Sequence, residues 1–127
     1  MKPLSFGYLY RNYAARHPSL TDMFFIIHAL DKPGQTQTTL DNYADHKSYL
    51  SSASIKTIVS GPLLDDDGVT MIGSFFLLEA DSKEEVIRFN ANDPFARIGL
   101  WQSVSINALN KRVDIVAMQS AFESRRE

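Results

Sequence analysis

Apolar residues along the chain recur in turn with a period of two, typical of strands, and a period near 3.6, typical of helices. Residues 23–30 form an apolar run closed by the turn sequence Asp-Lys-Pro-Gly, which predicts a first strand. Four residues at helical spacing then predict a helix with an apolar stripe: Leu40, Tyr43, Ala44 and Leu50. Three residues are candidates for its N-cap: Thr36, Thr38 and Thr39. Asp41 would lie in its first turn, and the serine-rich residues 51–54 would end it.

Two further strands follow in the pattern. Residues 55–60 are rich in β-branched side chains, and we expect Gly61 and Pro62 to stop this strand. An acidic turn at residues 65–68 leads into a third apolar strand at residues 70–80.

A second helix is predicted from Ser82, a favourable N-cap with acidic residues in the first turn. Three of its residues should face inward: Val86, Ile87 and Phe89. It should end at the sequence Asn-Asp-Pro, residues 92–94, because proline disfavours helical geometry in the residue before it. A short turn at residues 95–98 then precedes a last strand at residues 100–109.

The resulting β-α-β-β-α-β order predicts an α+β protein with the ferredoxin-like, split βαβ arrangement and an antiparallel sheet. Its first and third strands are apolar on both faces, whereas a sheet with one wet face alternates apolar and polar residues. Two helices cover only one face, so we expect the other face to pair with a second copy of the chain in a two-fold homodimer. The alternative is that residues 1–22 fold over it.

Composition narrows the classes of function. A chain of 127 residues with 44% hydrophobic and 22% charged residues suits one domain, here residues 23–113, with an extension at 1–22 and a tail at 114–127. The net charge of -2 and the lack of a basic patch argue against nucleic-acid binding, and no apolar run approaches the ~20 residues of a membrane helix. The absence of cysteine fits a reducing compartment, so we expect a cytoplasmic protein. The extension carries basic and no acidic residues before Asp22, which leaves open a transit segment, a flexible extension or an upstream start ahead of Met23.

Of the three histidines, His46 is the strongest candidate for chemistry. His17 lies in the basic extension and should be solvated, and His28 within an apolar strand should be a core or interface residue. His46 follows Tyr43 by three residues and precedes Leu50 by four, so it should face the sheet, where a polar group needs a partner or a cavity. Its neighbouring aspartates lack the spacing of metal ligands, and the acidic turn lacks the EF-hand pattern, so we expect no metal site.

Asp93 is the second candidate. As the residue before Pro94 it is first a turn residue, but a carboxylate at this corner would also fix the tautomer of an imidazole and support general acid–base catalysis. The sequence leaves open whether Asp93 and His46 meet.

An ordered set of short motifs resembles the YCII-related (YciI-like) family over residues 23–113. The motifs are Met-Phe-Phe-Ile-Ile-His-Ala-Leu-Asp at 23–31, Asp-His-Lys-Ser-Tyr-Leu at 45–50, Ser-Gly-Pro at 60–62, Gly-Ser at 73–74, Glu-Glu-Val at 84–86, Asn-Asp-Pro-Phe at 92–95 and Gly-Leu at 99–100. The resemblance implies the dimeric α/β-barrel superfamily and an active-site pair of His46 and Asp93. It also implies that Gly73 and Ser74 line the same cleft and bind substrate.

Two functions remain in view. The first is an enzyme that uses His46 and Asp93, without metal or redox cofactor, for lyase, isomerase or hydrolase chemistry on a small cyclic or aromatic-derived acid or lactone. The alternative is a metabolite-binding or assembly module that does not catalyse a reaction.

Overall fold

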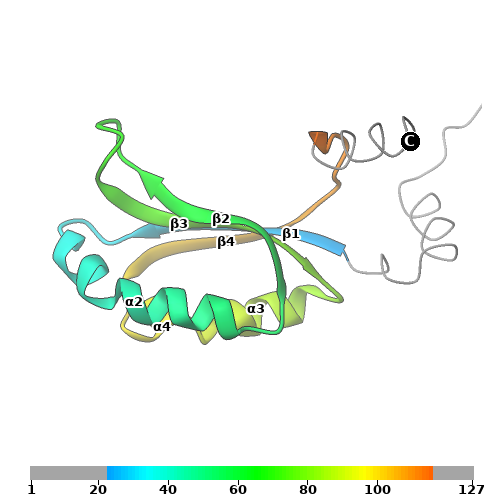
Figure 1. The fold of residues 1–127 in the computed structure, drawn as a ribbon, viewed down its shortest axis with the longest axis horizontal. Coiled ribbons are helices and arrows are strands. Elements are labelled where there is room, and N and C mark those ends of the chain that lie inside the picture. The colour runs from blue at the N-terminus through cyan, green and yellow to red at the C-terminus, as the bar shows by residue number, and fades with distance from the viewer. Residues whose placement is uncertain (1–22, 116–127) are drawn as a thin grey trace, which may run out of the picture.

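One antiparallel sheet and three helices make up the described part of the chain. The structure is a computed structural model that describes residues 23–115. The strands are β1 (Met23–Asp31), β2 (Lys56–Leu64), β3 (Met71–Ala80) and β4 (Trp101–Leu109), in the sheet order β2-β3-β1-β4. The helices are α2 (Thr36–Ser52), α3 (Lys83–Ala91) and α4 (Pro94–Arg97), and all lie on one face of the sheet (Figure 1). The ferredoxin-like α+β fold is therefore confirmed. The extension at 1–22 and most of the tail lie outside the described residues.

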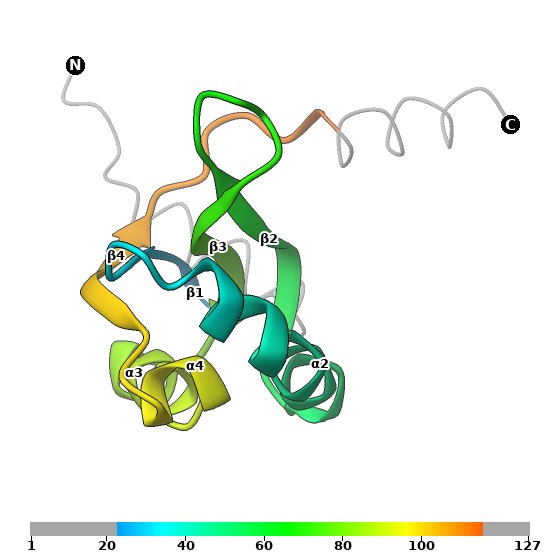
Figure 2. The same ribbon diagram turned by 90° about the vertical axis from the view of Figure 1, so that its left-hand side faces the viewer.

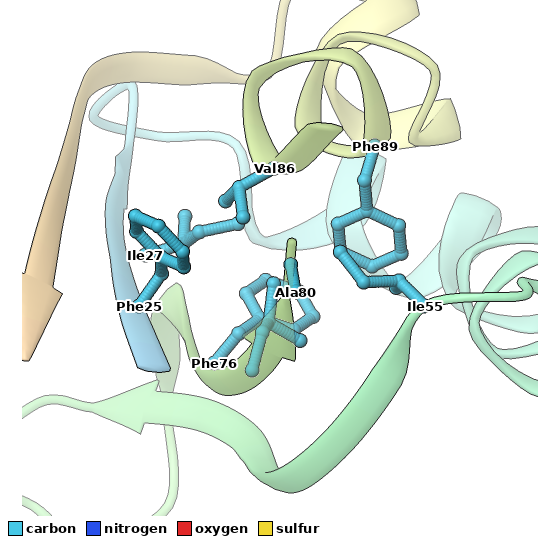
Figure 3. Close-up of a cluster of buried hydrophobic side chains, with 8 residues drawn as sticks. Phe25, Ile27, Ile55, Phe76, Ala80, Val86 and Phe89 are labelled. Carbon is cyan, nitrogen blue, oxygen red and sulfur yellow. The ribbon is translucent and has the colours of Figure 1, made fainter. Parts of the chain in front are cut away.

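The helices divide the covered face between them. Figure 2 shows α2 beneath the half of the sheet formed by β2 and β3, and α3 with α4 beneath the half that contains β4. The core lies between these layers and consists of buried side chains from β1, β3, α3 and the residue before β2: Phe25, Ile27, Ile55, Phe76, Leu78, Ala80, Val86 and Phe89 (Figure 3). On β1 the buried residues alternate along the strand, as the pleat of a sheet requires, and on β3 the same alternation holds for residues 74–78.

No helix or strand of residues 23–115 packs against the opposite face of the sheet (Figure 1). Apolar side chains are only partly covered there, including Phe24, Ile26, Phe75 and Leu77. The segment after β4 reaches one corner, where Lys111 Nζ lies 4.2 Å from the centre of the Phe24 ring. We call this surface the open face. The prediction that both faces are apolar is confirmed for β1 and β3.

Strand β2 is longer than predicted. It continues through Gly61 and Pro62 to Leu64, so the expectation that these residues stop the strand was wrong. The reason is its position, because β2 lies at the edge of the sheet, where the N–H that proline lacks is not needed for a second neighbour.

The predictions for both helices need correction. In α2, Leu40 is 53% exposed and Ala44 is also exposed, so the buried face of the helix is rotated from the predicted apolar stripe. The helix also begins earlier than expected, with Gln35 at the N-cap position and no acidic residue in the first turn. The three threonines proposed as caps therefore lie inside the helix.

In α3, the Ser82 hydroxyl accepts a hydrogen bond from the Glu85 N–H, which confirms the predicted cap. Ile87, in contrast, is 47% exposed rather than inward-facing. Val86 and Phe89 lie three residues apart on the same face of this short helix, and they form its buried apolar contact.

Candidate active site

Asp93 lies at the corner where α3 ends and α4 begins. Its backbone is extended, as expected before proline, and Pro94 occupies the first position of α4, where a missing N–H costs nothing. The side chain caps α4, because Asp93 Oδ1 accepts a hydrogen bond of 2.9 Å from the Phe95 N–H. The local turn predicted from the sequence is therefore present, and it holds one carboxylate oxygen in a fixed place.

The same oxygen meets His46. The distance from His46 Nδ1 to Asp93 Oδ1 is 2.9 Å, and both residues are buried, with Asp93 only 1% exposed. An ionised carboxylate only accepts hydrogen bonds, so Nδ1 carries the proton and Nε2 presents a lone pair. Asp93 Oδ2 is also buried and has no hydrogen-bond partner within residues 23–115. The structure thus brings together the two residues that the sequence singled out.

Two aromatic rings hold the imidazole in its plane. The Phe95 ring stacks on His46 with centroids 4.1 Å apart and an angle of 12° between the planes. Phe76 meets the imidazole edge-on from the sheet, at a centroid distance of 6.1 Å. With one face stacked on Phe95 and Nδ1 bonded to Asp93, His46 has little freedom to turn.

His46 lines a cavity of about 420 Å³ between α2 and strands β2 and β3. From α2 the cavity is lined by Thr39, Tyr43, His46, Lys47, Leu50 and Ser51, and from the sheet by Thr57, Ser60, Gly61, Pro62, Met71, Gly73, Ser74 and Phe76. Phe95 completes the wall, whereas Asp93 is not part of it. The imidazole therefore stands between the carboxylate and the cavity, and the volume falls in the range typical of small-molecule sites.

Gly73 and Ser74 were expected to lie in one cleft with His46, and all three residues line this cavity. Ser74 is buried on the helix-covered side of β3, opposite Ala29 of β1. Gly73 has a steric reason to be glycine, since a Cβ at this position would lie 2.2 Å from the carbonyl oxygen of Ala29. Whether either residue binds a substrate stays a prediction.

Sequence reasoning missed a second carboxylate near the cavity. Asp31 Oδ2 accepts a hydrogen bond of 3.2 Å from the hydroxyl of Thr39, a cavity residue. Burial raises the pKa of Asp31, and this effect outweighs the lowering by the Thr39 hydrogen bond and by the charge of His46. A sequence signal existed for Thr39, which lies seven residues before His46 and so on the same face of α2. Asp31 gave no such signal, because an aspartate before Pro-Gly looks like a turn residue.

Residues 23–115 contain no cluster of three or more histidine, aspartate and glutamate side chains arranged to hold a metal ion. Across the same residues, no helix has the length and apolar character needed to span a membrane.

The family model described as the YCII-related domain matches residues 23–110. Among solved structures, the chain is similar to 5-chloro-2-hydroxyhydroquinone dehydrochlorinase (TftG) from Burkholderia phenoliruptrix, solved in complex with 2,5-dihydroxybenzoquinone. The two share 39% sequence identity and a TM-score of 0.65, over 71% of this chain and 96% of that one.

Two other solved structures are more distant. A protein from Pseudomonas aeruginosa is 12% identical, with a TM-score of 0.47 over 72% of this chain and 95% of that one. One from Arabidopsis thaliana is 15% identical, with a TM-score of 0.43 over 72% and 97%. A comparison with curated protein sequences gave no match. The domain match and the 39% identity confirm the resemblance seen in the sequence: this chain belongs to the YCII-related family.

Proposed function

We propose that the chain is a small-molecule enzyme in which His46 moves a proton to and from a hydroxylated six-membered ring, with Asp93 holding the imidazole in place. The observation that carries this proposal is the position of His46, bonded through Nδ1 to buried Asp93 and lining the cavity. That arrangement leaves Nε2 as the base. The imidazolium formed when Nε2 takes a proton is stabilised by the adjacent carboxylate.

Dehydrochlorination is the reaction class that we favour, because a relative with 39% identity over almost its whole length is a dehydrochlorinase of a chlorinated hydroxyhydroquinone. In the keto tautomer of such a ring, the carbon that bears chlorine is tetrahedral and carries one hydrogen. His46 Nε2 removes the proton of a ring hydroxyl, the O–H electron pair becomes a carbonyl, the neighbouring double bond shifts and chloride leaves. The net change is loss of HCl, and a proton-transfer residue is the only group that this step asks of the protein.

The cavity wall combines apolar side chains with hydroxyl groups, and this combination suits a hydroxylated ring. Phe76, Phe95 and Leu50 offer apolar contact to a ring, and hydroxyl groups of threonine, tyrosine and serine stand around them. Ser74 is a candidate hydroxyl on the sheet side, and Gly73 lets the strand pass close to β1 beside it.

The test is chloride release from 5-chloro-2-hydroxyhydroquinone, followed with a chloride electrode while the product is followed by absorbance. We expect His46→Gln to lower turnover by about 10² to 10⁴, the range that general acid–base catalysis contributes. Asp45→Asn is the control, because Asp45 is next to His46 in the sequence but lies on the exposed side of α2, so its substitution should leave turnover unchanged. A folded His46→Gln variant with wild-type turnover would refute the proposal. Binding without turnover in the wild type would favour the metabolite-binding alternative.

We further propose that the open face pairs with a second copy of the chain. Its apolar residues are not covered by any helix of residues 23–115, and Val59 at its β2 edge is 53% exposed. An apolar surface of this kind marks an interaction site more often than a solvated face, and a two-fold homodimer would bury it on both copies.

A further inference from the structure

Thr39 lies at the end of the cavity away from Lys47 and Ser51, and its hydroxyl is bonded to Asp31, which stands behind the cavity wall. The proposed acid–base chemistry uses neither residue. Asp31 is the last residue of β1, where the pairing with β4 shifts register between Leu30 and Asp31. Its carboxylate reaches the first turns of α2 and bonds to the Thr39 hydroxyl at 3.2 Å. Thr39 is 3% exposed, so this is a buried hydroxyl at the cavity wall rather than a surface contact.

The direction of this hydrogen bond fixes what Thr39 offers to the cavity. A carboxylate has no proton to give, so the Thr39 hydroxyl is the donor and Asp31 Oδ2 the acceptor. The hydroxyl hydrogen is thereby used, whereas the two lone pairs of the oxygen remain. Thr39 therefore presents an acceptor, and it matches a ligand group that brings its own hydrogen.

Spacing along α2 places this acceptor at a useful distance from His46. The two residues are seven positions apart on one face, which corresponds to about 10.5 Å along the helix axis. For two side chains that leave the helix in parallel, with a hydrogen bond of ~2.8 Å pointing inward along the axis from each, the ligand atoms would lie about 5 Å apart. That span is close to the separation of oxygens on opposite sides of a six-membered ring.

Partial burial of the Asp31 carboxylate lowers the stability of the folded chain. Burial raises its pKa, which means that the folded chain disfavours the ionised form, and no cation forms an ion pair with it within residues 23–115. A residue that served only the turn before Pro33 would not need to point toward α2. The arrangement has the character of a site in which a polar group is kept for binding rather than for stability.

We propose that Thr39, with Asp31 as its positioning residue, binds a second hydroxyl of the substrate on the side of the ring away from His46. The substrate class is thus a ring with hydroxyl groups at opposite positions, one reacting at His46 and one donating to Thr39. This inference rests on the proposed function, since it takes the cavity beside His46 as the substrate site.

Binding of two matched ring compounds tests this without turnover. Hydroquinone has two hydroxyls at opposite positions, and 4-methoxyphenol has lost the hydrogen of one of them. By calorimetric titration, the wild type should bind hydroquinone about tenfold more tightly or better, because the analogue leaves a buried acceptor without its donor. Thr39→Val should bring the ratio of the two Kd values to about one, whereas Thr39→Ser, which restores the hydroxyl, should recover the preference.

Thr38→Val is the matched control, because the Thr38 hydroxyl bonds to Gln35 Oε1 and does not line the cavity, and it should keep the wild-type ratio. Asp31→Ala tests the positioning role and should reduce the preference, since the Thr39 hydroxyl then loses the acceptor that fixes the direction of its hydrogen. A folded Thr39→Val variant that keeps the preference would overturn the inference. If Thr39→Val does not fold, Thr39→Ala, which also lacks the hydroxyl and suits a helix, provides the same test.

The outcome separates this inference from the proposed function. Loss of chloride release in His46→Gln together with equal binding of both ring compounds by the wild type would retain the catalytic pair and remove the second hydroxyl site. A wild type that binds neither compound would overturn the hydroxyl site as well, whatever the His46 assay shows. Preferential binding of hydroquinone together with wild-type turnover in His46→Gln would retain the second hydroxyl site and refute the catalytic pair.

Discussion

Replacing Asp93 by asparagine separates the charge of this residue from its shape. Asparagine is as good an N-cap as aspartate, so the hydrogen bond from the Phe95 N–H should survive. That bond orients the amide oxygen toward His46 Nδ1 as well, since both contacts go to the same atom. The amide nitrogen then takes the place of Oδ2, which has no partner in the described part of the chain. Asp93→Asn should therefore remove the negative charge and change little else.

The expected loss of activity follows from the distance. When His46 accepts a proton, its charge lies 2.9 Å from a carboxylate oxygen. With an effective dielectric constant of about 20, the attraction is about 6 kcal/mol, which corresponds to roughly 10⁴ in rate as an upper value. Partial charge transfer in the transition state lowers it, so we expect kcat to fall by about 10² to 10⁴.

The expected loss of stability is much smaller. A hydrogen bond to a charged group contributes about 1.5–3 kcal/mol and a neutral one about 0.5–1.5 kcal/mol, so the substitution should cost about 1 kcal/mol. For a domain of this size that lowers Tm by roughly 4–8 °C and leaves the protein folded at 25 °C. Activity and stability should thus change by very different amounts, which a purely structural role for Asp93 would not produce.

The assay compares kcat for chloride release with thermal unfolding followed by circular dichroism. Asp45→Asn is the matched control, because it removes the same charge from the residue next to His46 but on the exposed side of α2. It should leave kcat within about twofold of the wild type, since an exposed charge is screened by solvent and salt. A folded Asp93→Asn variant with a loss below tenfold, or an equal loss in Asp45→Asn, would refute the reasoning.

Three further predictions concern the fold and assembly. Gly73→Ala should lower Tm strongly, because the added Cβ would meet a backbone oxygen at 2.2 Å, whereas Gly61→Ala on the neighbouring strand has nothing within 4 Å and should change Tm little. Burial raises the pKa of Tyr49, with the charge of Asp93 adding to it, so the folded chain binds the phenol proton more tightly. The free energy of unfolding should therefore fall as pH rises above about 10. Tyr49→Phe should lack this alkaline loss in denaturation measured as a function of pH, although it also loses the 2.7 Å hydrogen bond to the Phe89 carbonyl. Ile26→Lys on the open face should convert a dimer into a folded monomer in sedimentation velocity, and an unchanged sedimentation coefficient would contradict pairing through that face.

Much of the fold was predictable because it depends on local patterns. Alternation in β1 and β3, the Ser82 cap and the Asp-Pro corner each act within a few residues, and the order of the elements then selects the ferredoxin-like arrangement. The errors arose where the outcome depends on whether a strand lies at the edge of the sheet, or on which face of a helix is buried. Pro62 ended the predicted strand because the sequence does not reveal that β2 has only one neighbour. Leu40 was assigned to the buried face of α2, although that face is set by the contact of Thr39 and His46 with the sheet side.

The candidate site was predictable only in part. The helical spacing of His46 placed it toward the sheet, which the structure confirms. Its contact with Asp93 spans 47 residues and depends on how α4 packs beside α2, which no local pattern encodes. Asp31 and Thr39 escaped for a related reason, because each looks like a local turn or helix-cap residue, and only the fold brings the end of β1 to the start of α2.

The turn and the catalytic interpretations of Asp93 do not compete, because one oxygen serves both. Oδ1 is held in place by the N–H of Phe95, and the ring of that same residue stacks on His46. The short helix α4 therefore positions the carboxylate through its backbone and the imidazole through the side chain of Phe95. A turn that is rigid for reasons of its own geometry gives the histidine a fixed partner without any further hydrogen bond to Oδ2. This explains how a domain of about 90 residues can hold a buried ionisable pair in a single orientation beside a cavity.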